Sequence, residues 1–161
     1  MRAEDLTRAR YGTALPVTGE VPPALAAILD RRVTRRYRAE PVSEEALALV
    51  LAGAQSAPSK SDLQQYSIMV TRDAAKIAAV ADAIGTMPWI KGAPVLLLVC
   101  GDIRRGREVC AAHGRAHANN SIDTFLNAAA DAALALGFAV MAADALGLGT
   151  CPISYVRNHL R

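Results

Sequence analysis

Aromatic residues are scarce in this chain of 161 residues: they make up 4% of it, against 52% for hydrophobic residues as a whole. The core must therefore be built from Ala, Leu, Val and Ile, whose side chains make many small contacts. Charged residues contribute 20%, which together with the hydrophobic share excludes a mainly disordered chain. The length fits one domain. Because large side chains are few, we expect the core to need a partner surface, as in an oligomer.

Cysteine and lysine are also sparse. Cys100, Cys110 and Cys151 form an odd set without a CxxC pair, which argues against a disulfide framework and gives no spacing for a zinc site. We interpret them as reduced thiols in a cytoplasmic protein. The first ten residues lack the apolar stretch of a secretory signal. Only three of the 18 basic residues are lysines, and the net charge is +3.

Residues 1–21 contain Gly12, Pro16 and Gly19, so we expect an irregular N-terminal arm, followed by one domain over 22–161. Residues 102–120 give a weak polar pattern, which predicts a mobile excursion with surface histidines. The last five residues predict the opening of a further helix. The remaining patterns predict helices over 22–32, 44–57, 73–85 and 121–146, and strands over 66–71, 93–101 and 151–156.

The predicted helix over 121–146 is apolar on nearly all sides and long enough to span a bilayer. Its interruptions are Asn127, Asp131 and Asp144, and an acid at mid-membrane costs about 3 kcal/mol. The acids and the many alanines favour a central helix of a protein outside the membrane, with another helix packed closely against it.

Three segments carry candidate binding chemistry. The first has five arginines within residues 31–38, whose planar donor forks suit a phosphate. A solvated basic face and a nucleic-acid site are the alternatives there, although the low charge and few aromatics disfavour the latter. The second, residues 58–64, is either a ligand-contacting loop or a hydrophilic turn. The third, residues 147–154, is either a close backbone approach to a ligand or a plain helix C-cap, and it lacks a GxGxxG motif.

Together these segments, in the order RRVTRRY, APSKSDLQQ, APVLLLVCGD and AADALGLGTCPISY, resemble the FMN-dependent nitroreductase family, in the branch of oxygen-insensitive nitroreductases and NAD(P)H-flavin reductases. The resemblance covers roughly residues 22–161. It implies an α+β three-layer sandwich with helices around a small mixed or antiparallel sheet. It also implies an intertwined homodimer with two shared FMN sites, no membrane and no nucleic acid.

The resemblance assigns roles to three groups of residues. The flavin phosphate and ribityl chain would be bound by Arg31, Arg32 and Arg35. The loop that reaches the isoalloxazine, partly from the second subunit, would contribute Ser59, Lys60, Asp62 and Gln64. The backbone beside the flavin ring would be that of Pro152, Ile153 and Ser154. The Ser154 N–H would then lie near flavin N5.

The implied reaction is a ping-pong hydride transfer from NAD(P)H through FMN to a nitroaromatic, quinone or flavin. No side chain is assigned as a catalytic acid or base, because the flavin carries the chemistry. Departures from the family pattern are Val33, Lys60, Asp62 and Tyr155, and the C-terminal part of the family is not represented. A flavin-binding or dimerisation module without turnover is therefore the alternative function, and a phosphate- or nucleic-acid-binding protein is a third.

Overall fold

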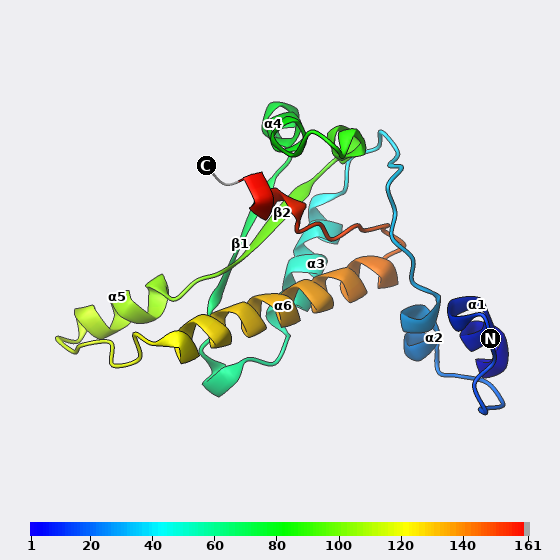
Figure 1. The fold of residues 1–161 in the computed structure, drawn as a ribbon, viewed down its shortest axis with the longest axis horizontal. Helices are drawn as coiled ribbons and strands as arrows, with labels where there is room; N and C mark the ends of the chain where they lie inside the picture. Colours follow the sequence, from blue (N-terminus) through cyan, green and yellow to red (C-terminus); the bar gives the residue numbers. More distant parts are fainter. Residues whose placement is uncertain (160–161) are drawn as a thin grey trace.

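The computed structural model describes residues 1–159 of the chain. Figure 1 shows a long central helix, α6, beside a two-stranded ribbon, with smaller helices at both ends. The α-helices and strands are α1 (Ala3–Tyr11), α2 (Pro23–Asp30), α3 (Glu44–Gln55), β1 (Tyr66–Thr71), α4 (Ala74–Ile84), β2 (Leu96–Gly101), α5 (Arg104–Ala112) and α6 (Ile122–Ala145). Short 3₁₀ turns are η1 (Lys60–Asp62), η2 (Pro88–Gly92) and η3 (Tyr155–His159).

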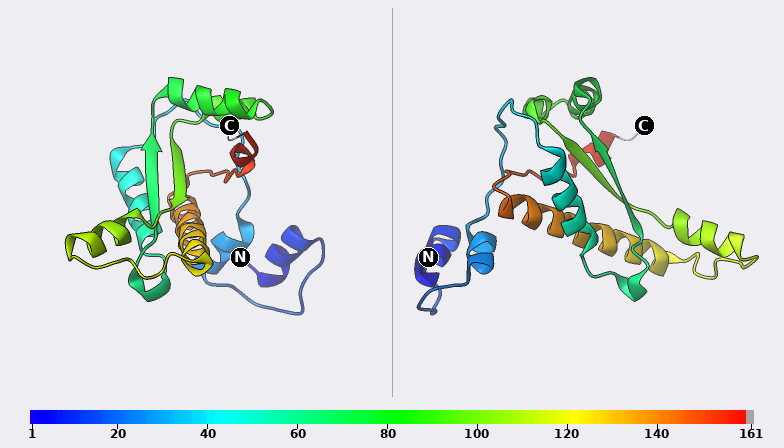
Figure 2. Two further views of the ribbon diagram at one scale, coloured as in Figure 1. Left: turned by 60° about the vertical axis from the view of Figure 1, so that its left-hand side comes forward. Right: turned by 180° about the vertical axis from the view of Figure 1, so that it is seen from behind.

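Strands β1 and β2 pair antiparallel, with Tyr66 opposite Gly101 and Thr71 opposite Leu96. Helix α6 contacts both strands and packs along α3, as both views of Figure 2 show. Helix α4 lies at one end of the ribbon against η2 and η3. The chain is thus an α+β protein in which one long helix organises the sheet and its neighbours.

Small residues set the contact between α3 and α6. Its buried cluster is Val50, Ala54, Ala139 and Ala143, with Ala54 fully inaccessible. A Cβ at Gly53 would lie 2.6 Å from the Cβ of Ala142, so the two helices approach too closely for a larger residue there. The prediction that the alanines of this helix allow close helix packing is confirmed. Although α6 is long and apolar enough to cross a membrane, it packs against α3 and both strands at the centre of the fold.

A second buried cluster joins α4 to η2 and consists of Ile77, Ala81, Ile84 and Ile90. Helices α3 and α4 both have a side-chain cap at the N-terminus: Ser43 Oγ accepts from the Ala46 N–H at 3.1 Å, and Asp73 Oδ1 accepts from the Ala75 N–H at 2.9 Å. Sequence therefore located α3 and α4 correctly because local capping and apolar spacing agree there.

Three predicted elements were wrong. Residues 1–21 include helix α1, which has acids in its first turn, arginines in its last, and Gly12 in the left-handed region at its C-terminus. Helix α5 occupies part of the predicted excursion over 102–120. Residues 151–154 are extended but belong to neither strand, because a strand requires a hydrogen-bonded neighbour and none pairs with them among the described residues. The helix predicted for the last five residues coincides, as far as His159, with the 3₁₀ turn η3. Residues 160–161 lie outside the described part of the chain.

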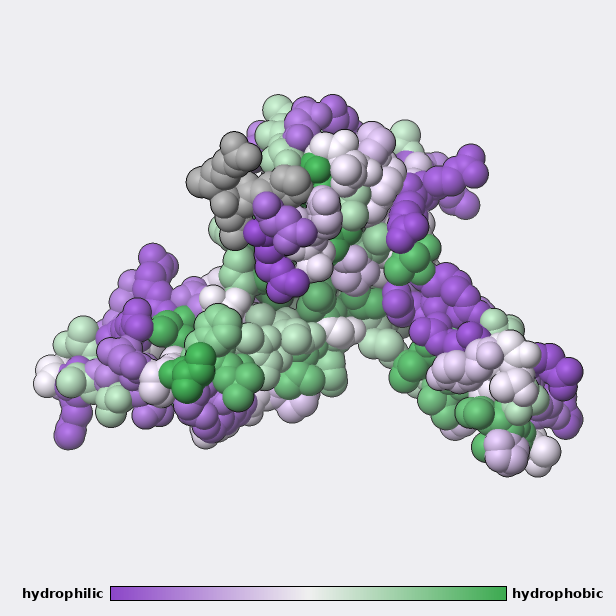
Figure 3. All heavy atoms as spheres, in the orientation of Figure 1, coloured by the Kyte–Doolittle hydropathy of each residue, from purple (hydrophilic) through white to green (hydrophobic). Residues whose placement is uncertain are grey.

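The chain exposes much more surface than a compact protein of its mass. Its accessible area is 10822 Å², whereas a folded monomer of 17.0 kDa exposes about 7,700 Å² by the usual scaling. Helices α1 and α2 form a pair at one end of α6, away from the sheet, and α5 extends from the other end (Figures 1 and 2). Figure 3 shows a hydrophobic surface along α6, where Ile122, Phe125 and Leu126 are 79%, 68% and 62% exposed. Much apolar surface of α6 is therefore left uncovered by the described residues.

Candidate functional site

Two of the three candidate segments meet at the C-terminal end of α6. The Thr34 N–H donates to the Thr150 carbonyl at 2.8 Å. A Cβ placed on Gly149 would overlap the Thr34 side chain, so only glycine allows this approach. The arginine segment and the GLGT segment therefore form one junction.

Three buried polar atoms on or next to these segments have no hydrogen-bond partner within residues 1–159: Arg31 Nη1, Thr150 Oγ1, and Asp144 Oδ2 near the end of α6. Burial raises the pKa of the Asp144 carboxyl, and the charge of Arg31 opposes that shift. Buried polar groups are normally paired, so these atoms are candidates for contact with a polar ligand. Arg31 Nη1 and the Thr150 hydroxyl are donors, whereas Asp144 is an acid.

The other predicted arginines are held in different ways. Arg35 stacks on Trp89, with its guanidinium carbon 6.0 Å from the ring centroid, and Tyr37 lies beside the same ring at 6.4 Å between centroids. Burial raises the pKa of the Tyr37 hydroxyl. Arg32 Nη1 donates to the carbonyls of Leu29, Asp30 and Arg31, so this side chain caps the C-terminus of α2.

An open apolar groove of about 1430 Å³ adjoins the junction. Its walls come from β2, from α6 and from the segment after α6, and they include Thr34, Trp89, Val140 and Thr150. The predicted residues Pro152 and Ile153 line it, whereas the exposed Ser154 does not. The arginines in its lining are Arg36 and Arg38, whereas the predicted Arg31, Arg32 and Arg35 do not line it. An apolar groove with basic residues in its lining is compatible with a flat ligand that carries an anionic tail.

The second candidate segment lies elsewhere. The loop with Ser59, Lys60, Asp62 and Gln64 contacts α6 at Asp131, whereas the junction lies beside Asp144. Thirteen residues of helix separate these two acids by about 20 Å along its axis. A single copy of the chain therefore brings the first and third groups of predicted residues together, but not the second.

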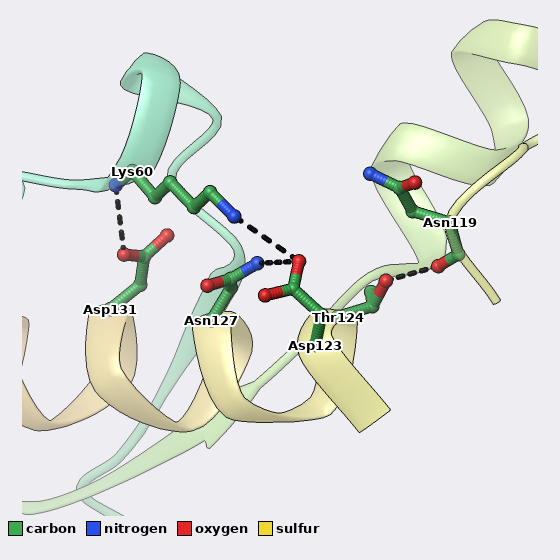
Figure 4. A network of polar contacts seen from close by, with 6 residues as sticks. All are labelled: Lys60, Asn119, Asp123, Thr124, Asn127 and Asp131. Carbon is green, nitrogen blue, oxygen red and sulfur yellow. Dashed lines mark hydrogen bonds and ion pairs between the residues drawn. The ribbon is translucent and has the colours of Figure 1, made fainter. Parts of the chain in front are cut away.

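A row of polar side chains on α6 faces this loop, as Figure 4 shows. Lys60 Nζ donates to Asp123 Oδ2 at 3.1 Å, and Asn127 Nδ2 donates to the same oxygen at 2.9 Å. These contacts lower the pKa of the Asp123 carboxyl. The row continues one turn further to Asp131, which accepts from the Lys60 N–H at 3.2 Å. Helical spacing of four residues places all three on one face.

Residues 28–159 of the chain match the Nitroreductase family. The chain belongs to this family. It is 36% identical over 137 residues to the FMN reductase [NAD(P)H] of Bacillus subtilis (strain 168). The aligned region covers 84% of this chain and 55% of that protein. It is also 29% identical over 140 residues to the oxygen-insensitive NADPH nitroreductase of Salmonella typhimurium, covering 86% of this chain and 56% of that one.

The structure has the nitroreductase fold. It resembles the solved structure of the hypothetical oxidoreductase YcnD from Bacillus subtilis with a TM-score of 0.82 and 35% identity, over 86% of this chain and 57% of that chain. The predicted family and α+β fold are thus confirmed. The chain spans little more than half the length of the curated relatives that it matches.

Sequence reasoning missed three residues around the candidate site of this nitroreductase-family chain. Trp89 lies under Arg35, and Arg105 Nη2 donates to the Leu63 carbonyl at 3.1 Å and to that of Gln64. Neither had a local signal, because each acts on a segment far away in sequence. Asp131 was visible as a polar interruption of an apolar helix, but its partners were not.

Proposed function

We propose that the chain is the FMN-binding part of an NAD(P)H-dependent oxidoreductase of the cytoplasm. The observation that carries this proposal is the buried, unpaired Arg31 Nη1, on the arginine segment that the Thr34–Thr150 hydrogen bond joins to the GLGT segment. The names of the relatives support it, since they include an FMN reductase and an NADPH-flavin oxidoreductase.

The residues at the junction fit a flavin phosphate. The unpartnered Nη1 of Arg31 and the Thr150 hydroxyl match the acceptor oxygens of a phosphate, and the charge of Arg31 offsets that of the neighbouring Asp144. Arg31 and Arg35 would bind it, with Arg32 holding the end of α2 in place. The apolar groove lined by Pro152 and Ile153 would take the flat ring system and exclude water from its inner face.

FMN, when bound, would accept a hydride from NAD(P)H and deliver it to a nitroaromatic, quinone or flavin acceptor. The protein's part is binding, orientation and electrostatics. The backbone N–H of Ser154 would face the reacting edge of the ring, and the open groove would admit donor and acceptor in turn. We assign no side chain as a proton donor.

We further propose a homodimer in which the second copy supplies Ser59, Lys60, Asp62 and Gln64. Three observations support it: the excess accessible area, the exposed apolar residues of α6, and the position of the loop about 20 Å along α6 from the junction. Stable homodimer interfaces bury roughly 2,000 Å² or more, which is compatible with the excess. The loop that lies far from the junction of its own copy can then complete the site of the other copy.

Titration of the purified protein with FMN tests the function. We expect saturable quenching of flavin fluorescence at one FMN per chain, and oxidation of NADH or NADPH when menadione or nitrofurazone is added. A protein that stays colourless after incubation with FMN and dialysis contradicts the proposal. Binding of FMN without NAD(P)H oxidation favours the alternative of a flavin-binding module without turnover.

A double substitution Phe125→Glu and Leu126→Glu tests the dimer. Both side chains are exposed in one copy, so monomer folding should be little affected, whereas two buried charges would disrupt an interface. Light scattering coupled to size-exclusion chromatography should show the wild type at twice the chain mass and the variant at the chain mass. Ala75→Glu, which adds a charge on the exposed face of α4, should remain dimeric. A monomeric wild type refutes the shared site.

A further inference from the structure

Asp131 is a buried carboxylate near the middle of an otherwise apolar helix, with 2% of its surface exposed. Its two oxygens accept from the two ends of one loop: Oδ1 from the Lys60 N–H at 3.2 Å and Oδ2 from the Gln65 N–H at 3.0 Å. Figure 4 shows the first of these contacts. A buried charge is costly unless it is well paired, so this placement demands a reason beyond packing.

The loop between these two amides has an unusual backbone. Ser61, Asp62 and Gln64 have φ angles of 53°, 53° and 48°, in the left-handed region that residues other than glycine seldom adopt. Such conformations persist only where surrounding contacts hold them. Three of them within four residues therefore require an external clamp.

Side chains on both sides of the loop provide such a clamp. Asp131 holds two N–H groups, and Arg105 of α5 holds the carbonyls of Leu63 and Gln64 from the other side. Both side chains of the Lys60–Asp123 ion pair are exposed, so the pair contributes little to holding the loop in place. The inaccessible carboxylate of Asp131 is consequently the main restraint on the N–H side.

We propose that Asp131 is a positioning residue for the cofactor: it fixes the 59–65 loop in the left-handed conformation that presents Asp62 and Gln64 to the flavin. This inference rests on the proposed function, because the loop is assigned to FMN there. Asp131 itself does not touch the cofactor. It acts through the backbone of the loop, and its negative charge is matched by amide dipoles rather than by a cation.

Asp131→Asn and Asp131→Leu test the proposal by hydrogen exchange and by FMN titration. In the wild type, the amides of Lys60 and Gln65 should exchange slowly, and in Asp131→Leu both should lose protection. The dissociation constant of FMN should rise about tenfold or more in Asp131→Leu, as expected when charge-assisted hydrogen bonds are lost. Asp131→Asn keeps one carbonyl oxygen, so it should retain protection at one amide and show a smaller rise.

Asp73→Ala is the matched control, because it removes an N-cap carboxylate from α4 and destabilises the fold without touching the loop. It should leave both the loop exchange and the FMN affinity at wild-type values. Fast exchange of the Lys60 and Gln65 amides in the wild type overturns the proposal even if no variant folds. Unchanged FMN affinity in Asp131→Leu also overturns it. A wild type that binds no FMN refutes the proposed function. In that case the exchange rates of the two amides still show whether Asp131 holds the loop.

Discussion

Replacing Arg31 and Arg35 together by alanine should raise the dissociation constant of FMN by about 100-fold, since two charge-assisted contacts to a phosphate are lost. The unpaired, buried Nη1 of Arg31 is the donor best placed for that role. Arg35 is restrained by Trp89, so its guanidinium is already ordered before a ligand arrives. Fluorescence titration with FMN measures the change, and riboflavin, which has no phosphate, should lose little affinity.

The same double variant should unfold only slightly below the wild-type temperature. Neither guanidinium forms an ion pair within residues 1–159, and the exposed Arg35 adds little stability, whereas loss of the half-buried Arg31 removes a favourable charge near Asp144. Arg8→Ala, which removes an exposed arginine from α1, controls for the loss of positive charge. If the double variant purifies with the wild-type flavin content, the phosphate site has been placed wrongly.

Gly149→Ala should have the second largest effect. Its new Cβ would collide with the side chain of Thr34 and force apart the two segments that the Thr34–Thr150 hydrogen bond joins. Overpacking of this kind costs about 1–3 kcal/mol, and the junction that we assign to FMN would open as well. Thermal unfolding should therefore show a lower midpoint, and flavin titration a weaker affinity.

A compensating change at Thr34 makes this expectation specific. Thr34→Gly removes the three atoms nearest to the new Cβ, so the double variant Thr34→Gly with Gly149→Ala should recover most of the FMN affinity lost by Gly149→Ala alone. The effects of the two substitutions on FMN affinity should then be non-additive, as expected of residues in contact. Additive losses would show that the collision is not the cause.

Sequence predicted those elements in which local signals and tertiary packing agree. Helix α4 has an Asp73 cap and a closing Gly85, and β1 has a suitable alternation. Helix α1 was not predicted because its buried residue Leu6 belongs to a helix that packs against α2, and no local pattern indicates that contact. The extended segment over 151–154 resembles a strand, but strands are defined by a neighbour that the sequence cannot specify.

The candidate site shows the same division. The arginine and GLGT segments were recognised from residue types, and the structure explains their meeting through Thr34 and Gly149. The clamp on the 59–65 loop could not be predicted, because Asp131 contacts amides about 70 positions away, and those contacts depend on how α6 crosses the sheet. Contacts over such separations follow from the whole topology rather than from any segment.

The stacking of Arg35 on Trp89 has a practical consequence. Trp89 is the sole tryptophan of the chain, and it lies at the rim of the apolar groove, next to Tyr37. Its indole emission therefore comes from one known place and responds to whatever alters its stacked neighbours. The protein carries an intrinsic optical probe of this region, with no label to attach.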